Sequence, residues 1–211
     1  MRTEELIALI AEDAPAGPPL GVRLRRGLVL GIAGSILILL ATIGIRPDLM
    51  AALGSPRVVF KLGFTLLLAA SACGLVFRVG VPGLSVRSRA RLLILPVLLL
   101  LAGLTVELAV LPAGAWGASL VGRNAAFCLF FIPVLSLVPL AGLLWALRSG
   151  APESPGLAGA ATGLAAGSVA AAIYAWHCPD DSPLFVATWY GLAIVGVAAA
   201  GFCIGRRWLR W

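Results

Sequence analysis

Six apolar runs constrain this chain more than any other feature of its sequence. Each run is close to the roughly 20 residues that a helix needs to cross a hydrocarbon core of about 30 Å. The runs cover Gly27 to Ile45, Val58 to Phe77, Leu92 to Leu111, Ala125 to Leu147, Leu157 to Trp176 and Leu184 to Ile204. Backbone groups in lipid must be satisfied within each segment, and the alternation typical of barrel strands is absent from the sequence. The sequence therefore predicts an all-α integral membrane protein, a bundle of six transmembrane helices.

Composition leaves little of the chain for anything outside the membrane. Of the 211 residues, 61% are hydrophobic and 12% are charged, and the mean hydropathy is +1.04. A soluble domain cannot hide so much apolar surface from water. We expect a cytoplasmic N-terminal segment at residues 1–26, a six-helix transmembrane domain at residues 27–205 and a basic cytoplasmic tail at residues 206–211.

The distribution of Lys and Arg among the loops predicts the orientation of the helices. One side of the predicted bundle holds Arg2, Arg23, Arg25, Arg26, Arg78, Arg87, Arg89, Arg91, Arg148, Arg206, Arg207 and Arg210. The other side holds Arg46, Arg57, Lys61 and Arg123. This asymmetry places both termini in the cytoplasm. The net charge of +7 is then explained by topology and lipid contact, and we expect no direct binding of nucleic acid.

The N-terminal segment is not a signal peptide, because acidic residues precede the first apolar run and no small-residue cleavage site follows it. Thr3 suits the N-cap of a short helix, which the residues from Pro15 to Pro19 end. The apolar positions of this helix are Leu6, Ile7, Leu9 and Ile10. We expect an amphipathic helix over residues 3–13 that binds a groove on a partner or lies on the membrane surface.

Small residues and prolines predict how the helices pack. The fifth run has a stripe of small residues four positions apart, at Gly159, Gly163, Gly167, Ala171 and Ala175. Such a stripe lets another helix approach closely, and packing within the chain is favoured over a dimer interface. Pro96, Pro133 and Pro139 are expected to kink the third and fourth helices and to free carbonyls that neighbouring residues must satisfy.

Two ionisable residues fall inside the apolar runs. Lys61 lies near the start of the second run and Glu107 near the outer end of the third, so the two are expected at a similar depth. They are predicted to form an intramembrane charge pair or to reach the interface with their side chains. A proton or ion path is the functional alternative.

Topology sorts the four cysteines by side. Cys73 and Cys203 fall on the inner side and are interpreted as small core residues. Cys128 lies a few residues into the fourth run from the outside, and Cys178 lies in the short outer loop after the fifth run. These two thiols are therefore expected on the oxidising face, at similar depth.

Three outcomes are open for the outer thiols. They can form a disulfide, stay separate as reactive thiols, or ligate a soft or transition metal ion. Further candidate ligands are His177, Asp180 and Asp181. His177 is equally explained as an interfacial hydrogen-bonding residue, and the aspartates as loop charges or, for Asp181, as a cap of the next helix. The residues alone establish no cofactor.

Several segments of the chain resemble the NrsF-like family of six-span bacterial anti-sigma factors. They are Cys128 to Leu137, His177 to Phe185 followed by Trp189 and Tyr190, Thr3 to Ile7, and Arg46 to Leu49. The resemblance covers essentially the whole chain. It implies a multi-pass protein of the bacterial inner membrane that holds an extracytoplasmic-function sigma factor and releases it under heavy-metal or oxidative stress.

The resemblance also implies which residues carry the signal. Two cysteines are needed for signalling in that family, and the matching positions here are Cys128 and Cys178. A change at these thiols would shift the fourth, fifth and sixth helices and pass through the bundle to the cytoplasmic segments.

Two other classes of function compete with this interpretation. A small ion or solute transporter would use the Lys61 and Glu107 charges, although the sequence has no evident inverted repeat. A membrane redox enzyme would use the single histidine with the outer thiols and carboxylates, but it lacks a second histidine or a recognisable catalytic motif. We therefore expect a regulator and not an enzyme.

Overall fold

The computed structural model describes residues 2–5, 17–81, 83 and 85–210. The apolar positions of the expected N-terminal partner-binding helix, Leu6, Ile7, Leu9 and Ile10, lie outside the described residues. The amphipathic helix over residues 3–13 therefore stays a prediction.

Six helices of the described chain are long and apolar enough to cross a membrane. Four of these spans are α2 (Leu20–Thr42), α4 (Pro56–Val79), α8 (Ala125–Leu147) and α9 (Pro155–Tyr174). The other two are Arg87–Val110, whose main helix is α6 (Ile94–Val110), and Pro183–Trp208, whose main helix is α11 (Gly191–Trp208). The shorter elements are α3 (Leu49–Ala52), α5 (Arg87–Arg91), a 3₁₀ turn (Ala113–Ala115), α7 (Trp116–Val121), α10 (Pro183–Phe185) and a π-helical turn (Val186–Tyr190). Across the described residues there is no β-strand. The predicted all-α bundle of six spans is confirmed.

The starts of the helices follow from local sequence. Each of α4, α9 and α10 has a serine as its N-cap and a proline as its first residue, at residues 55–56, 154–155 and 182–183. Proline suits the first helical position because its missing N–H has no partner there in any case. Helix α2 begins at Leu20, directly after Pro19. Arg23, Arg25 and Arg26, which the sequence placed in the segment before the first span, therefore lie on the first turns of α2.

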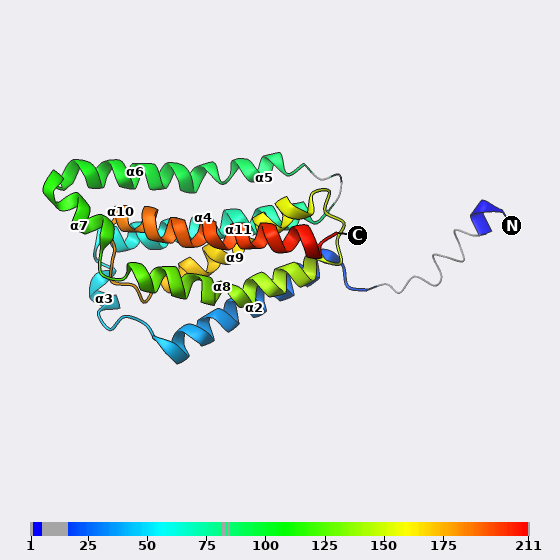
Figure 1. Ribbon diagram of the computed structural model, residues 1–211, viewed down its shortest axis with the longest axis horizontal. Coiled ribbons are helices and arrows are strands. Elements are labelled where there is room, and N and C mark those ends of the chain that lie inside the picture. The colour runs from blue at the N-terminus through cyan, green and yellow to red at the C-terminus, as the bar shows by residue number, and fades with distance from the viewer. Residues whose placement is uncertain (1, 6–16, 82, 84, 211) are drawn as a thin grey trace.

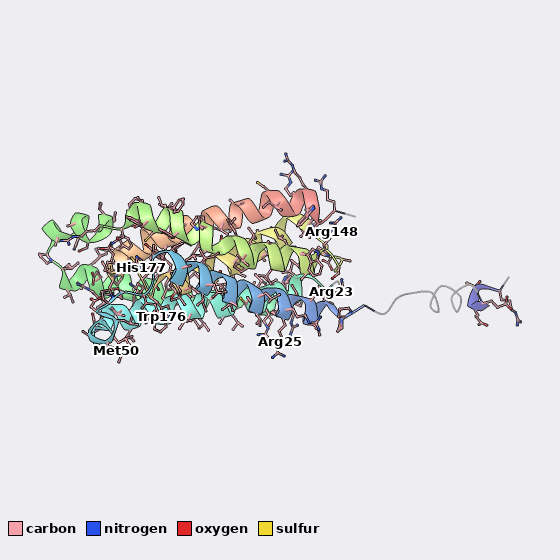
Figure 2. All side chains as sticks on the ribbon, turned by 90° about the horizontal axis from the view of Figure 1, so that it is seen from below. Arg23, Arg25, Met50, Arg148, Trp176 and His177 are labelled. Atoms are coloured by element: carbon pink, nitrogen blue, oxygen red, sulfur yellow. The ribbon has the colours of Figure 1, made fainter. Side chains whose placement is uncertain are left out.

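The two ends of the bundle differ in chemistry. One end holds the start of α2, the end of α11 and the short helix α5. Its arginines are Arg23, Arg25, Arg26, Arg78, Arg87, Arg89, Arg91, Arg148, Arg206, Arg207 and Arg210. We call it the arginine end. The opposite end holds α3, α7 and α10 (Figure 1), and we call it the thiol end. In Figure 2, Arg23, Arg25 and Arg148 lie toward the arginine end, whereas Trp176 and His177 lie toward the thiol end.

Helix α9 forms the centre of the bundle and α6 its edge. In the most apolar stretch of α9, 78% of the residues are buried, and this helix packs against α4, α8 and α11. In the most apolar stretch of the span that contains α6, only 11% of the residues are buried. Figure 1 shows α6 running alongside the other helices at the margin of the molecule.

The stripe of small residues on α9 packs within the chain, as predicted. Gly159 and Gly163 face Gly201 and Gly205 of α11 so closely that a Cβ on Gly205 would lie 2.7 Å from the Cα of Gly159. A contact this short leaves no room for a side chain on either helix. Gly167 continues the same contact against α11.

Pro139 illustrates how a neighbouring helix satisfies a freed carbonyl. Proline has no N–H, so the carbonyl of Leu135 loses its helical partner. The hydroxyl of Ser35 on α2 lies 2.6 Å from that oxygen and supplies the hydrogen bond. Gly31, one turn earlier on α2, faces Pro139 directly, because a Cβ there would lie 2.7 Å from the proline Cβ. The expectation that neighbours satisfy freed carbonyls is confirmed at this position.

Candidate functional site: a buried thiol pair

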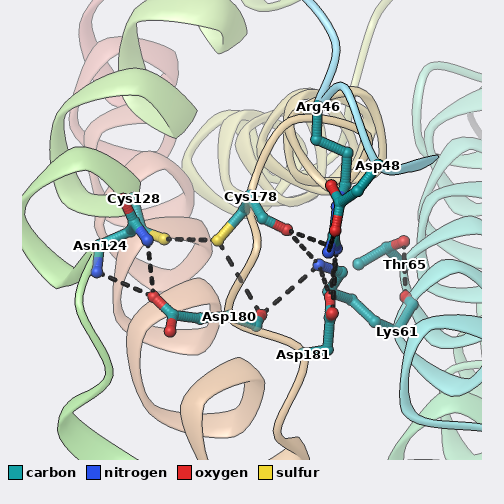
Figure 3. A network of polar contacts seen from close by, with 9 residues as sticks. All are labelled: Arg46, Asp48, Lys61, Thr65, Asn124, Cys128, Cys178, Asp180 and Asp181. Carbon is teal, nitrogen blue, oxygen red and sulfur yellow. Dashed lines mark hydrogen bonds and ion pairs between the residues drawn. The ribbon is translucent and has the colours of Figure 1, made fainter. Parts of the chain in front are cut away.

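Two cysteines lie against each other at the thiol end (Figure 3). Cys128 is in the first turn of α8, and Cys178 follows the end of α9, where its N–H donates to the carbonyl of Tyr174 at 3.2 Å. Their Sγ atoms are 4.0 Å apart, and both residues are 0% exposed. Both are free thiols. The structure therefore brings together the two outer cysteines that the sequence singled out.

Asp180 fixes the start of α8 beside the loop that carries Cys178. One carboxylate oxygen of Asp180 accepts from the N–H of Arg123 at 3.0 Å, the N–H of Asn124 at 2.8 Å and the side-chain amide of Asn124 at 2.9 Å. The first N–H groups of a helix lack internal partners, and a carboxylate there also meets the positive end of the helix dipole. Asp180 thus connects the α9–α10 loop to the turn of helix that bears Cys128.

Asp181 connects the same loop to two buried cations. Its carboxylate accepts from the ammonium of Lys61, which is 0% exposed, and from Nη1 of Arg46 at 2.9 Å. Lys61 also donates to the carbonyl oxygen of Cys178 at 2.7 Å. Arg46 in turn pairs with Asp48 at 2.8 Å. We call Arg46, Asp48, Lys61 and Asp181 the charge clamp.

The charge clamp satisfies groups that would be costly to bury alone. Hydrogen bonds to Asp48 and Asp181 raise the pKa of Arg46 above its ordinary value, and the same contact lowers the pKa of the Asp48 carboxyl. Arg46 and Asp48 therefore stay charged around neutral pH.

The clamp also acts on the thiol. The hydrogen bond with Cys128 and the positive charge of Lys61 lower the pKa of Cys178 to about 7, although burial opposes the shift. A thiolate is the nucleophilic and metal-binding form of cysteine. Cys178 is therefore the thiol of the pair that is prepared for chemistry near neutral pH.

The predicted pair of Lys61 with Glu107 is wrong. Lys61 turns to Asp181, whereas Glu107 accepts from Nε of Arg57 at 3.0 Å and from the hydroxyl of Ser182 at 2.8 Å. Arg57 lies one turn before Lys61 on α4 and is closer to α6, so it takes the carboxylate. Glu107 is 5% exposed and, with Pro96, is one of two buried residues of α6.

The five candidate metal ligands do not converge. Nδ1 of His177 lies 3.0 Å from the carbonyl oxygen of Gly44, and the two aspartates are held by Asn124 and by the charge clamp. Within the described ranges, no group of three or more His, Cys, Asp and Glu side chains is arranged to hold a metal ion. The thiols of Cys128 and Cys178 are the members of the expected ligand set that face each other.

Two tyrosines complete the surroundings of the thiols. Tyr174 and Tyr190 are fully buried in the same apolar cluster as both cysteines, with ring centroids 5.9 Å apart. In the described structure neither hydroxyl has a hydrogen-bond partner. The π-helical turn that ends at Tyr190 widens the helix there, a feature that is frequent at functional sites.

The other two cysteines lie away from this site. Cys73 is partly buried in α4, and Cys203 is exposed on α11, so the interpretation as a core residue is wrong for Cys203. Arg46, Asp48, Asn124, Tyr174 and Ser182 were not singled out as site residues by the sequence. The position of Asp48 two residues after Arg46 was the one local signal, because the two charges lie within reach of each other.

The fold and site define a class of protein, a six-span helical membrane protein with a buried thiol pair held by a charge clamp at one end of the bundle. The chain belongs to the family described as "Negative regulator of sigma F", whose sequence model matches residues 10–211. The resemblance seen in the sequence is confirmed.

Two named relatives are similar to the chain over its full length. A protein of Azospira oryzae (strain ATCC BAA-33 / DSM 13638 / PS) named "Probable anti-sigma-F factor NrsF" is 35% identical over 213 residues, covering 100% of each chain. A protein of Caulobacter vibrioides (strain NA1000 / CB15N) named "Anti-sigma-F factor NrsF" is 37% identical over 224 residues, again covering 100% of each chain. No solved structure matches this chain significantly.

Proposed function

We propose that this protein is an anti-sigma factor of the bacterial inner membrane. It holds an extracytoplasmic-function sigma factor on the cytoplasmic side and releases it when Cys128 and Cys178 meet heavy metal ions or oxidants. Membership of the family and the names of the two relatives support a sigma factor as the partner. The protein acts as a regulator and not as an enzyme.

The charge asymmetry of the bundle supports the orientation. Lys and Arg are retained on the cytoplasmic side of a membrane protein, and the arginine end carries most of them. This end, the segment at residues 1–26 and the tail at residues 206–211 therefore face the cytoplasm, and the thiol end faces the periplasm. The apolar positions Leu6, Ile7, Leu9 and Ile10 are the surface we assign to the partner.

The observation that carries the proposal is the placement of the thiol pair. The Sγ atoms are 4.0 Å apart and lie at the end of the bundle opposite the arginine end. Binding of the sigma factor, which we assign to the arginine end, does not require a reactive thiol pair at the thiol end. A disulfide would need the sulfurs to close to about 2.05 Å, and a bridging soft metal ion would move them as well. Either change displaces Cys178 relative to Cys128.

The contacts of the site explain how such a displacement leaves it. The loop that bears Cys178 is tied to the start of α8 through Asp180 and to α4 through Lys61 and Asp181. Shifts of packed helices are a common form of switching, because a packed core has discrete arrangements. The movement therefore reaches the arginine end through α4, α8 and α9.

The transporter alternative has lost its main support. It relied on an intramembrane pair between Lys61 and Glu107, and these residues have other partners. We therefore propose the anti-sigma function alone.

The test measures retention of the partner. Full-length tagged protein is co-expressed with each extracytoplasmic-function sigma factor of the source bacterium in turn, and the sigma factor in the membrane fraction is quantified before and after cadmium or peroxide. We expect retention before treatment and release after it. Cys128→Ser and Cys178→Ser should abolish the release, whereas Cys203→Ser, on an exposed position of α11, should leave it unchanged.

Two outcomes would contradict the proposal. If no sigma factor is retained by the unmodified protein, the partner is wrong. If both serine variants release the sigma factor normally, the sensor is wrong even though the partner stands. A variant without residues 1–14 that still retains the sigma factor would contradict the assignment of Leu6, Ile7, Leu9 and Ile10.

A further inference from the structure

A crevice lies at the arginine end, away from the thiol pair. It has a volume of about 480 Å³ and is lined by α4, by the first part of α9 and by the segment before α5. This volume is within the range of about 300 to 1,000 Å³ that small-molecule sites occupy. The crevice takes no part in the proposed sensing of metals or oxidants.

The walls of the crevice are apolar. Leu75 of α4 and Leu157, Ala161 and Leu164 of α9 contribute to them. Within the described residues, Leu157 is 63% exposed. Because these residues belong to membrane-crossing helices, the walls lie at a depth where acyl chains and not water surround the protein.

The weak attachment of α6 leaves this space open. Among the described residues of α6, only Pro96 and Glu107 are buried, and Glu107 is anchored at the thiol end by Arg57 and Ser182. Toward the arginine end, the span that continues into α5 lies at the margin of the bundle (Figure 1). A gap between spans in the bilayer cannot stay empty, and no side chain of α6 lines it.

The mouth of the crevice is positively charged. Arg78, in the last turn of α4, lines it. Arg89 on α5 does not line the crevice, but its guanidinium lies against α4 one turn before Arg78, because a Cβ on Gly74 would lie 3.7 Å from its Nη1. In the described part of the chain neither guanidinium has an ion-pair partner. The acidic residue at the mouth, Glu153, accepts a hydrogen bond from the N–H of Gly83 at 3.3 Å.

A crevice with apolar walls, with Arg78 at its mouth and Arg89 nearby, fits a ligand that has both an acyl chain and a phosphate group. Arginine binds phosphate oxygens through charge-assisted and often bidentate hydrogen bonds. Basic pockets between membrane helices on the side of the positive residues bind anionic lipid head groups. We propose that the crevice is a binding site for an anionic glycerophospholipid, with an acyl chain between α4 and α9 and its phosphate on Arg78 and Arg89.

The test uses the full-length protein purified in a neutral detergent. Phosphatidylglycerol and phosphatidylcholine with the same acyl chains are added separately, and bound lipid is measured by native mass spectrometry and by the shift of the thermal unfolding midpoint. We expect phosphatidylglycerol to bind as one tightly held adduct and to raise the midpoint, and phosphatidylcholine to do so weakly. Inorganic phosphate alone should do neither, because it cannot fill the apolar walls.

Two variants locate the site. Arg78→Gln with Arg89→Gln should weaken phosphatidylglycerol binding about tenfold or more. The matched control, Arg25→Gln with Arg210→Gln, removes the same charge from the arginine end at one residue on α2 and one in the C-terminal tail, and it should bind normally. Ala160→Phe fills the crevice and keeps both arginines, so it should also prevent binding.

Four results would overturn the inference. Equal binding of the two lipids would show that the mouth does not select charge, and equal weakening by the control pair would show a surface effect spread over the whole end. A dimer without bound lipid would assign the crevice to a second copy of the chain. A monomer without bound lipid, whose thermal unfolding midpoint is unchanged by Ala160→Phe, would assign it to the chain's own N-terminal segment. None of these results depends on whether a sigma factor is bound.

Discussion

The ammonium group of Lys61 donates a hydrogen bond of 2.7 Å to the carbonyl oxygen of Cys178, a residue 117 positions later in the chain. The same ammonium pairs with Asp181. One buried cation on α4 therefore holds the loop of the reactive thiol and also supplies part of the field at its sulfur.

Replacing Lys61 by Met should cost about 3 kcal/mol in the free energy of unfolding, because removing one partner of a buried ion pair leaves a carboxylate only partly compensated. Unfolding in a series of denaturing detergent mixtures measures this loss. Lys61→Gln can keep the hydrogen bond to Cys178 without the charge. It should recover part of the stability while the pKa of Cys178 still rises, and a pKa that stays low in both variants would refute the role of the charge.

The reactivity of Cys178 should change with pH around neutrality. Its pKa in the folded protein is lowered to about 7, against about 8.5 in an unfolded chain. Modification by a small thiol reagent should therefore reach half its maximal rate near pH 7 in the folded protein and near pH 8.5 in the denatured protein. Peptide mass spectrometry of samples quenched at a series of pH values distinguishes Cys178 from the other thiols.

The same shift predicts a pH dependence of stability. A group with a lowered folded-state pKa contributes stability that is fully present above its unfolded pKa and is lost as the pH falls through the folded pKa. The stability difference between the unmodified protein and Cys178→Ser should therefore grow in favour of the unmodified protein between pH 6 and pH 9. A difference that is constant over this range would contradict the thiolate.

Mild oxidation should join Cys128 and Cys178 within one chain. Their sulfurs start 4.0 Å apart and need to close to about 2.05 Å, a change that side-chain rotation and a small helix shift can supply. Diamide treatment followed by non-reducing mass analysis should show a loss of two hydrogens and a peptide cross-link. Cross-linking between chains instead, or none in Cys73→Ser and Cys203→Ser backgrounds, would rule out the intramolecular pair.

Glu107→Gln should loosen α6 without unfolding the bundle. The carboxylate accepts from Arg57 and Ser182, and a charged hydrogen bond contributes about 1.5 to 3 kcal/mol. We expect faster hydrogen exchange over residues 94–110 and little change in α9. Glu153→Gln at the other end of the bundle is the control, and equal exchange in both variants would show that Glu107 is not the anchor.

A side chain at Gly201 should disrupt the centre of the fold. A Cβ there would lie 3.0 Å from the Cα of Gly163, whereas a Cβ at Gly196 on the same helix would meet nothing within 4 Å. Gly201→Val should therefore lower stability by about 3 kcal/mol or more, and Gly196→Val by well under 1 kcal/mol. Similar losses at both positions would mean that valine destabilises α11 for reasons other than contact with α9.

The sequence predicts the membrane helices and their closest contact well, because both depend on local pattern. Apolar length locates the spans within a few residues, and small residues four apart locate the face of α9 that meets α11. The two sensor candidates were also predictable, because Cys128 and Cys178 each lie near the end of a run on the same side of the bundle.

The pairing of charges was not predictable in the same way. Lys61 and Glu107 have matching depth, but depth does not say how each helix is rotated about its axis. Rotation decides that α6 meets Arg57 and that Lys61 turns to a loop more than a hundred residues away.

The central position of α9 has a consequence for the synthesis of the protein. Among the six spans, α9 has the lowest mean hydropathy and the greatest burial, because its inward-facing glycines and alanines suit close packing and not contact with lipid. A translating ribosome therefore delivers the small-residue helix α9 directly after the strongly apolar α8. The glycines of α9 lack their packing partner until the last helix, α11, has been synthesised.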